Sequence, residues 1–406
     1  MKTIKNEYKK VKLGSYSEPW RTIRLGDIIT CIKGNKPLKM ASANNRNCLP
    51  YLSTEYLREN KPNKFVYDLK STIIINDGDL ILLWDGSNAG EFFLGKNGIL
   101  SSTMAKMEII KEVYDNKFLF YILKQREQYL KGLTKGTGIP HVDGYVLNNL
   151  SIPFPPILEQ KKIAEILSTV DEAVEKVSQA IDGTEKLKKG LINELLTKGI
   201  GHKEFKEADI EIIPKTWTLV RLGDVCHQRN EVILPSGKGD YKYVGLEHIK
   251  SGEINLDLHE MDINIKSTKF RFYEGDILYG KLRPYLDKAV SINFSGICST
   301  DLLVLKPIKN KTLVDFIIWI IHSNKFIQHA ILTTSGTNHP RTSWSAISKF
   351  RFYLPPLPEQ KEIVEVLNRV SMRRDILRNR KEKLERVKKG LMNDLLTGRK
   401  RVKVEA

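Results

Sequence analysis

The sequence predicts an α+β protein that contains two copies of one unit, each a globular domain followed by a long helix. The clearest sign is repetition at a nearly fixed distance. The segment around Glu159-Gln160 recurs around Glu359-Gln360, and residues 188–197 recur as 388–397, in both cases 200 residues later. Residues 24–27 (Arg-Leu-Gly-Asp) recur 197 residues later as 221–224. A period this long indicates a duplicated domain and not a solenoid of short repeats.

The predicted globular domains are rich in short apolar runs separated by turn residues. In the first copy, residues 72–75 and 80–84 flank an Asn-Asp-Gly-Asp turn. In the second copy, residues 270–273 and 277–279 flank a Glu-Gly-Asp turn. We expect each turn to join two strands of one sheet. Apolar periodicity predicts a helix over residues 115–128 and another over residues 312–331.

Two segments, residues 158–197 and 358–397, have the apolar spacing of a heptad seam. A Pro-Pro pair stands just before each of them, and charged residues fill most other positions. Each helix should be roughly 55–60 Å long, at 1.5 Å per residue. We expect the two helices to pair with each other as an antiparallel coiled coil, because neither globular domain is large enough to cover so long a helix. The alternative is that each helix packs on its own domain. The first seam consists of Ile163, Leu167, Val170, Val174, Val177, Ile181, Leu187, Leu191 and Leu195.

The second seam is less regular than the first. Arg374 and Lys381 stand where the first helix carries Val174 and Ile181. Either their charged heads extend to solvent, or they meet an acid of the other helix such as Glu185 or Glu175. The predicted boundaries are therefore a first domain over 1–155, a first helix over 156–200, a second domain over 201–352 and a second helix over 353–406.

Composition narrows the class of protein. The chain has 66 Lys and Arg against 48 Asp and Glu, a formal charge of +18, which favours a polyanionic partner such as nucleic acid. A lysine-rich proteome would give the same excess without any such partner. The four cysteines are scattered and predict reduced thiols. With a polar start and no apolar run longer than residues 316–321, we expect a cytoplasmic protein without a membrane segment.

Motifs for catalysis are missing from the sequence. There is no GxxxxGK[ST] phosphate-binding loop and no Asp/Asn-Pro-Pro-aromatic motif of an adenine methyltransferase. No cysteines or histidines have metal-ligand spacing. His141 and His339 follow a Gly-Thr pair in matching regions, but a loop histidine is more often solvated than catalytic. We therefore expect no catalytic residue, no metal and no cofactor on this chain.

The repeated motifs together resemble those of a known family. Pro-Pro-x-x-Glu-Gln-Lys at the start of a long helix, Lys-Lys-Gly-Leu-x-Asn-x-Leu-Leu-Thr at its end and Arg-Leu-Gly-Asp at the start of each domain resemble the specificity subunits of Type I restriction–modification enzymes. The resemblance covers essentially the whole chain. It implies two target recognition domains, each reading one half of a bipartite double-stranded DNA sequence.

The resemblance also implies a division of labour among subunits. The paired helices would space the two domains and dock two methyltransferase subunits, which carry S-adenosylmethionine and methylate adenine. A motor–nuclease subunit, where the system has one, would bring ATP and Mg²⁺. Two other classes of function stay open at this point: an enzyme with an unfamiliar site, and a stand-alone DNA-binding regulator.

Candidate DNA contacts are polar, aromatic and basic residues in equivalent loops of the two copies. The family supplies no residue list, because its recognition domains vary where they read bases. The run 280–285 (Gly-Lys-Leu-Arg-Pro-Tyr) is the best candidate, since Arg and Lys can pair with guanine O6 and N7 in the major groove. Its alternative is a solvated hairpin tip. The full set is Trp84, Asp85, Ser87, Asn88, Lys135, Thr137 and His141 in the first copy, and Lys281, Arg283, Tyr285, Thr337, Asn338, His339 and Arg341 in the second. Because the two sets differ, we expect two different half-sites.

Overall fold

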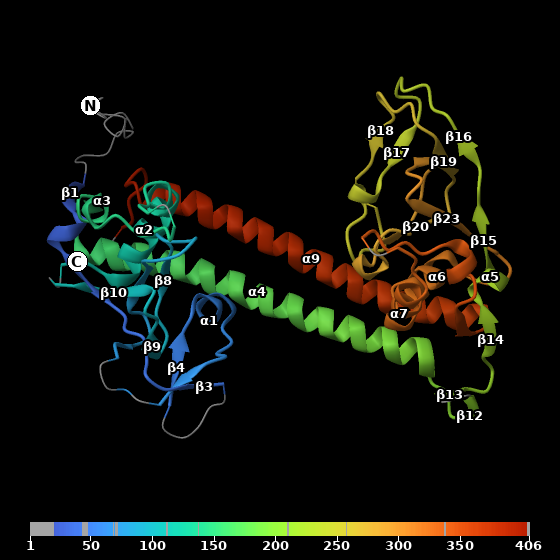
Figure 1. Ribbon diagram of the computed structural model, residues 1–406, viewed down its shortest axis with the longest axis horizontal. Coiled ribbons are helices and arrows are strands. Elements are labelled where there is room, and N and C mark those ends of the chain that lie inside the picture. Colours follow the sequence, from blue (N-terminus) through green and yellow to red (C-terminus); the bar gives the residue numbers. More distant parts are fainter. Residues whose placement is uncertain are drawn as a thin grey trace. The chain divides into compact units, whose positions relative to one another are not determined.

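The computed structural model describes residues 20–42, 48–67, 69, 72–110, 113–136, 138–208, 211–256, 258–336 and 338–403. Within these residues the chain forms two compact units (Figure 1). The first unit runs to Val177 and takes up the chain again at Arg380, and the second unit is Ser178–Asn379. Each unit thus combines one globular domain with stretches of both long helices.

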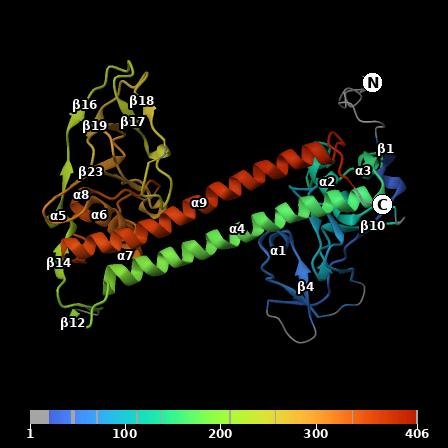
Figure 2. The ribbon, with the colours of Figure 1, turned by 180° about the vertical axis from the view of Figure 1, so that it is seen from behind.

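The two long helices are α4 (Ile157–Lys198) and α9 (Leu357–Leu395). They lie side by side in both views of the ribbon (Figures 1 and 2). In the first unit Asp171 of α4 pairs with Lys388 of α9 at 2.5 Å, and in the second unit Glu185 of α4 pairs with Arg378 at 3.0 Å. Residue numbers rise along α4 while those of the partners fall along α9, so the helices are antiparallel, as the sequence predicts.

The ends of both helices also belong to the cores of the domains. Ile163 and Leu167 of α4 and Leu395 of α9 are buried in the core of the first unit. Ile363 and Leu367 of α9 join the core of the second unit, together with Ile192 and Leu195 of α4. The two alternatives considered for these helices therefore both hold in part. They pair with each other, and each end is also covered by a domain.

The domain of the first unit contains two sheets and a short antiparallel pair. Within the described residues, one sheet has four strands in the order β2-β10-β7-β8, and the other has five in the order β3-β5-β4-β9-β6. Strands β1 and β11 form the pair that brings the start and end of the domain together. The strands are β1 (Arg21–Arg24), β2 (Ile29–Lys33), β3 (Met40–Ala41), β4 (Leu49–Leu52), β5 (Phe65–Val66), β6 (Ile74–Ile75), β7 (Leu80–Leu83), β8 (Phe92–Leu94), β9 (Gly98–Leu100), β10 (Met104–Ile109) and β11 (Ser151–Phe154), and the helices are α1 (Thr54–Glu59), α2 (Asn116–Lys131), α3 (Gly144–Asn148) and the 3₁₀ turn η1 (Leu25–Asp27).

The domain of the second unit repeats this plan. Its four-stranded sheet has the order β15-β23-β20-β21, and its five-stranded sheet has the order β16-β19-β22-β17-β18. The strands are β12 (Phe205–Ala208), β13 (Glu211–Pro214), β14 (Thr218–Arg221), β15 (Cys226–Arg229), β16 (Val232–Ile233), β17 (Lys242–Val244), β18 (Glu260–Met261), β19 (Lys269–Phe272), β20 (Ile277–Gly280), β21 (Ala289–Ser291), β22 (Gly296–Cys298), β23 (Leu302–Pro307) and β24 (Arg351–Leu354). The helices are α5 (Leu222–Val225), α6 (Val314–Ile321), α7 (Asn324–Leu332), α8 (Trp344–Ile347) and the 3₁₀ turns η2 (Leu246–His248) and η3 (Pro284–Leu286).

The duplication extends to strand pairing. Strands β4 and β9 are parallel in the first unit, and the matching β17 and β22 are parallel in the second. The five-stranded sheets share four matching strands, and their fifth strands lie at opposite edges. The strand β3 lies beside β5 in the first unit, whereas β16 lies beside β19 in the second. The internal duplication predicted from sequence is therefore a duplication of fold.

The Gly-Asp turns are placed differently from the prediction. Each of them joins strands of two different sheets, β6 to β7 in the first unit and β19 to β20 in the second. The glycines Gly78 and Gly275 have positive φ angles, 85° and 83°, which allow the chain to turn sharply from one sheet into the other. The carboxylates of Asp79 and Asp276 accept hydrogen bonds from the backbone N–H groups of Asn76 and Tyr273 and hold the turns closed.

The helix predicted over residues 312–331 is in fact two helices. Helix α6 ends at Ile321, and α7 begins at Asn324. Ser323 is the residue that separates them, because its side chain accepts a hydrogen bond from the N–H of Phe326 and so caps the start of α7. The first copy has no such break, and α2 continues from Asn116 to Lys131.

The Glu-Gln motif at the start of each long helix is a structural anchor. Gln360 is fully buried; its Oε1 accepts hydrogen bonds from the N–H of Leu313 (2.9 Å) and the hydroxyl of Thr312 (3.1 Å). Its Nε2 donates to the carbonyls of Pro355 (2.9 Å) and Lys311 (3.3 Å). This one side chain therefore ties the start of α6 to the start of α9.

Gln160 does the same in the first unit. Its Oε1 accepts from the N–H of Asp115 at 2.8 Å, and its Nε2 donates to the carbonyls of Val113 and Pro155 at 3.2 and 2.9 Å. Asp115 caps the start of α2, so the glutamine again joins the domain helix to the long helix.

The glutamate of the motif binds an indole in each unit. Glu359 accepts hydrogen bonds from Nε1 of Trp217 at 2.9 Å and lies 2.6 Å from Nε2 of His202. Glu159 accepts from Nε1 of Trp20 at 3.2 Å and forms a two-bond ion pair with Arg401, at 2.6 and 2.7 Å. The signature that carries the family resemblance thus fixes each long helix to its domain.

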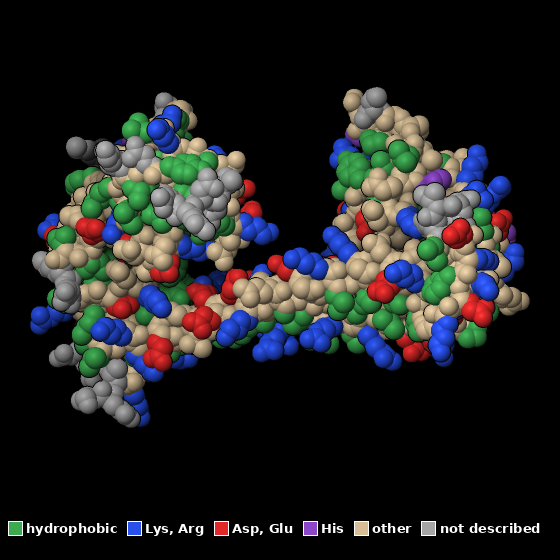
Figure 3. Space-filling model, turned by 90° about the horizontal axis from the view of Figure 1, so that it is seen from below, with side chains coloured by type: hydrophobic (Ala, Val, Ile, Leu, Met, Phe, Trp, Pro, Cys, Tyr) green, Lys and Arg blue, Asp and Glu red, His purple; other side chains and the backbone are tan. Residues whose placement is uncertain are grey.

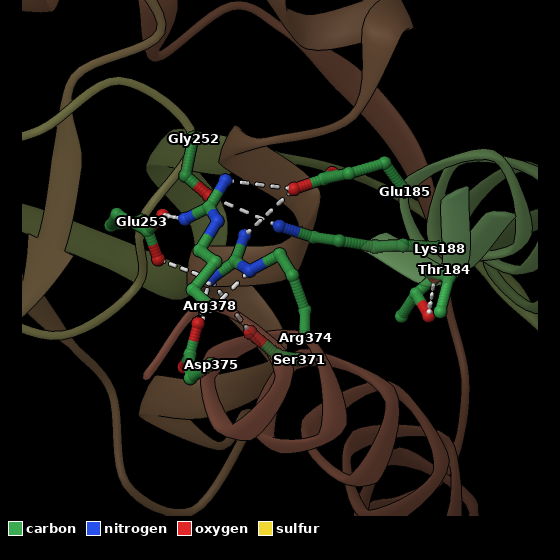
Figure 4. Close-up of polar contacts among 10 residues, drawn as sticks. Thr184, Glu185, Lys188, Gly252, Glu253, Ser371, Arg374, Asp375 and Arg378 are labelled. Atoms are coloured by element: carbon green, nitrogen blue, oxygen red, sulfur yellow. Dashed lines mark hydrogen bonds and ion pairs between the residues drawn. The ribbon is translucent and has the colours of Figure 1, made fainter. Parts of the chain in front are cut away.

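Arg374 in the second seam meets three acids, two of which the sequence did not indicate. Arg374 is 2% exposed and contacts Glu253 of the domain, Asp375 of its own helix and, at 3.6 Å, Glu185 of α4 (Figure 4). Lys188 of α4 donates to the carbonyl of Gly252 in the same cluster at 3.0 Å. Of the two alternatives left open for Arg374, the contact with an acid holds, and Glu185 is one of its partners. Lys381 is half-buried.

Among the helices formed by the described residues, none combines the length and apolarity that a bilayer span requires.

Candidate nucleic-acid interface

In the first unit the backbone brings the two predicted recognition loops together. The loop after β7 begins at Trp84, and the loop after α2 ends at Val142. The N–H of Val142 donates to the carbonyl of Trp84, and the N–H of Gly86 donates to that of Pro140, both at 2.9 Å. Lys135 and His141 exchange two backbone hydrogen bonds of 2.9 and 2.8 Å, which close the tip of the second loop. Trp84, Asp85, Lys135 and His141 therefore share one site.

The second unit builds the same loop pair. The N–H of Thr342 donates to the carbonyl of Lys281 at 3.0 Å, and the N–H of Arg283 donates to that of Pro340 at 2.8 Å. Ser335 and Arg341 exchange two backbone hydrogen bonds of 2.9 Å. The structure thus gathers Lys281, Arg283 and Arg341 in one place, with Tyr285 following in η3.

The matching bonds align the two loop pairs residue by residue. Gly86 corresponds to Arg283, because each donates to the proline of the second loop. His141 corresponds to Arg341, because each closes its loop tip in the same way. The two domains therefore share a loop scaffold and place different side chains on it.

Most of the predicted contact residues are accessible. The exposed ones are Ser87, Asn88, Lys135, Arg283, Tyr285, Asn338, His339 and Arg341, and the half-buried ones are Trp84, Asp85, His141 and Lys281. Thr137 and Thr337 lie outside the described residues. Trp84 packs partly against the core of its domain, so its ring also has a structural role.

Electrostatics distinguish the two loop pairs. At the first loop pair two lysines have acidic partners: Lys33 pairs with Asp85 and Lys135 pairs with Asp143, each at 2.8 Å. The hydrogen bond from Lys135 lowers the pKa of Asp143. In the second unit Arg341 pairs with Asp301 at 3.2 Å. Neither Lys281 nor Arg283 has a side-chain ion pair with any residue that the structure describes, so the second loop pair keeps more free positive charge.

Sequence reasoning did not identify three residues at the first loop pair. Lys33 ends β2 and reaches Asp85, and no sequence pattern indicates a contact between residues so far apart. Ile139 and Tyr145 are 71% and 76% exposed although they are large and apolar. Ile139 lies on the hydrogen-bonded loop, and Tyr145 lies in α3 just after it. For Ile139, the sequence offered one indication, an isoleucine within a glycine-rich loop.

Positive side chains are spread over the face of the molecule drawn in Figure 3. On the face drawn in Figure 3, Lys and Arg side chains lie among Asp and Glu side chains along the helices and over the globular parts. Such a distribution attracts phosphates without regard to sequence, while sequence reading requires defined side chains at base edges.

A protein-family model matches the chain in two places. The model of the Type I restriction modification DNA specificity domain matches residues 17–183 and 214–386. These two ranges together include most of the chain.

Similar proteins carry the same description. The specificity subunit of the Type I restriction enzyme MjaVIII from Methanocaldococcus jannaschii is 37% identical over 405 residues, covering 95% of this chain and 94% of that protein. The EcoDI specificity subunit of Escherichia coli is 23% identical, covering 86% of this chain and 81% of its own. Among solved structures, the crystal structure of a Type I S subunit from M. genitalium superimposes with a TM-score of 0.64 at 16% identity, covering 93% of this chain and 96% of that chain.

Proposed function

Since this chain belongs to the family of Type I restriction–modification DNA specificity subunits, we propose that each of its domains reads one half of a bipartite DNA target through its loop pair. The observation that supports this most directly is the repeated loop scaffold. Two hydrogen-bonded loop pairs with the same backbone bonds carry different side chains, as two readers of different half-sites would. The expected target is therefore not a palindrome.

The division of labour follows from the chemistry that this chain offers. Specificity subunits belong to multisubunit systems, and one of the solved structures of similar fold comes from work on the assembly of a Type I system. We propose that the antiparallel helices space the two domains on DNA and dock two methyltransferase subunits. S-adenosylmethionine, and ATP with Mg²⁺ where a motor–nuclease subunit exists, would then be bound by those partners.

Methylation mapping tests the proposal. The chain is produced with its co-purifying subunits, and methylated adenines are located in DNA of cells that express the complex. We expect one bipartite motif with two different half-sites and a gap of fixed length. The purified chain by itself should neither methylate nor cut DNA in the presence of S-adenosylmethionine and Mg²⁺. A symmetric motif, or catalysis by the isolated chain, would contradict the proposal.

Exchange of loops between domains gives a sharper test. Residues 84–88 and 133–142 would be replaced together by 281–285 and 333–342, because the same backbone bonds hold both pairs. We expect the first half-site of the mapped motif to change while the second half-site and the gap remain. An unchanged motif from a folded exchange variant would show that bases are read elsewhere in the domain.

A further inference from the structure

Arg283 has an unusual backbone conformation. Its φ and ψ angles are 51° and 67°, in the left-handed region. The other non-glycine residues with positive φ in the described part of the chain are Asn60, Asn264 and Asp287, and these residue types tolerate this region better than arginine does. Pro284 follows, and a residue before proline prefers an extended conformation. The backbone at Arg283 is therefore strained.

The first unit shows that the fold does not need a side chain here. Gly86 occupies the matching position, makes the matching bond to Pro140 and has a φ of 117°. A Cβ added to Gly86 would meet nothing within 4 Å. Glycine accepts this conformation without strain. The second unit instead retains an arginine in a conformation that disfavours it.

Nothing within the described chain uses the side chain of Arg283. It is exposed, and no described residue forms a hydrogen bond or an ion pair with its guanidinium. By contrast, Arg229 is held by Asp276 through two bonds, and Arg341 pairs with Asp301. A strained backbone that serves no internal contact points to a role toward a ligand.

The position of Arg283 is nevertheless well fixed. Its N–H donates to Pro340, and its carbonyl accepts from the N–H of Leu286 at 2.9 Å. Leu282, just before it, pairs with Arg341 across the two loops. A guanidinium presented from a fixed backbone loses less conformational freedom when it binds than one on a mobile loop.

We propose that Arg283 reads a guanine in the half-site of the second domain, an inference that rests on the proposed function. Two guanidinium N–H groups can donate together to O6 and N7 of guanine in the major groove. The planar guanidinium presents these donors in a rigid fork, whereas the ammonium of a lysine is a point charge on a flexible stem and orients them less well. Lys281 supplies further positive charge beside it for the phosphates. Because Gly86 has no side chain, the first domain makes no equivalent contact, and the two half-sites are read by different chemistry at this position.

Atomic substitution in the DNA tests the proposal. The complex with its methyltransferase subunits is titrated with duplexes that carry the mapped target, with each guanine of the second half-site replaced in turn by 7-deazaguanine. This base lacks the N7 acceptor. At one position the wild-type complex should bind about tenfold more weakly. The Arg283→Gly variant should bind that duplex and the unmodified duplex equally.

Two further measurements separate the alternatives. Arg283→Gly should unfold at the same temperature as the wild type or a higher one, because glycine relieves the strain, so weaker binding cannot be attributed to misfolding. Arg283→Lys should keep its affinity for unrelated DNA and show a smaller effect of 7-deazaguanine than the wild type. A variant that weakens binding to all sequences alike would show a phosphate contact and overturn the guanine assignment.

The outcomes also distinguish this inference from the function on which it rests. If the wild-type complex prefers its mapped target but is unaffected by 7-deazaguanine at every position, or if the half-site lacks guanine, only the role of Arg283 is wrong. If the wild-type complex prefers no sequence, the proposed function itself fails.

Discussion

Replacing Gln360 by alanine should destabilise the second unit more than most single substitutions. Gln360→Ala removes four hydrogen bonds at a fully buried position and leaves the N–H of Leu313 and the carbonyls of Pro355 and Lys311 without that partner. At about 1 kcal/mol for each bond, the free energy of unfolding should fall by about 4 kcal/mol. The cost arises because a buried polar group that loses its hydrogen-bond partner has no water to bond with instead.

The first unit supplies a matched variant. Gln160 makes three such bonds and lacks the one to a threonine hydroxyl, so Gln160→Ala should cost about 3 kcal/mol. Gln328, exposed on α7, is the control, and Gln328→Ala should change the free energy of unfolding by less than about 0.5 kcal/mol.

Urea unfolding measures the total change, and hydrogen exchange assigns it to a unit. Exchange should rise at the start of α6 for Gln360→Ala and at the start of α2 for Gln160→Ala, where each glutamine holds the first backbone groups. The anchoring role is refuted if Gln360→Ala unfolds within about 1 kcal/mol of the Gln328 control, or if both variants raise exchange in the same places.

Three further predictions concern the helix pair. Arg374→Met should cost about 3 kcal/mol in urea unfolding, because it removes a buried arginine and leaves half-buried Glu253 with less positive charge beside it. Glu253→Gln in the same chain should recover part of the loss, and a double variant as unstable as the sum of the two single variants would argue against coupling. Four residues inserted into the middle of α4 add about 6 Å, so methylation mapping should find a gap longer by one or two base pairs and unchanged half-sites. Residues 1–200 alone should sediment as a dimer, because Lys188 can replace Lys388 as the partner of Asp171; a monomer would refute this.

The internal repeats and the apolar periodicity predicted more of the fold than the composition did. The offset between copies revealed the duplication, and heptad spacing revealed α4 and α9. Contacts between distant segments were beyond reach, because they depend on how the sheets pack. Glu253 reaches Arg374 from a loop of the second domain, and no local pattern marks that meeting. The break between α6 and α7 shows the opposite problem, since Ser323 was a visible capping residue that apolar periodicity outweighed.

The sequence predicted which two loop regions form the candidate site in each copy. It did not predict which residues of the two copies occupy matching positions. The sequence placed one loop after β7 and another after α2, which was enough to list Trp84 and His141 together. It could not align Gly86 with Arg283, because their side chains share nothing. Only the bonds to Pro140 and Pro340 show that the two residues hold the same place. Residues that read a ligand vary most between copies, and for that reason sequence comparison aligns them least well.

The contacts of Glu159 and Glu359 indicate that the chain could be circularly permuted. Glu359 contacts His202 and Trp217, which one continuous stretch of chain joins. Glu159 contacts Arg401 and Trp20, which come from opposite ends of the described sequence, yet it holds them in the corresponding way. A copy of residues 203–216, used as a linker from residue 403 to residue 20, would connect the two ends of the described chain. The chain could then be cut within the original residues 203–216. The resulting protein would start at its second domain, and α4, α9 and the two loop pairs would keep all the contacts described above.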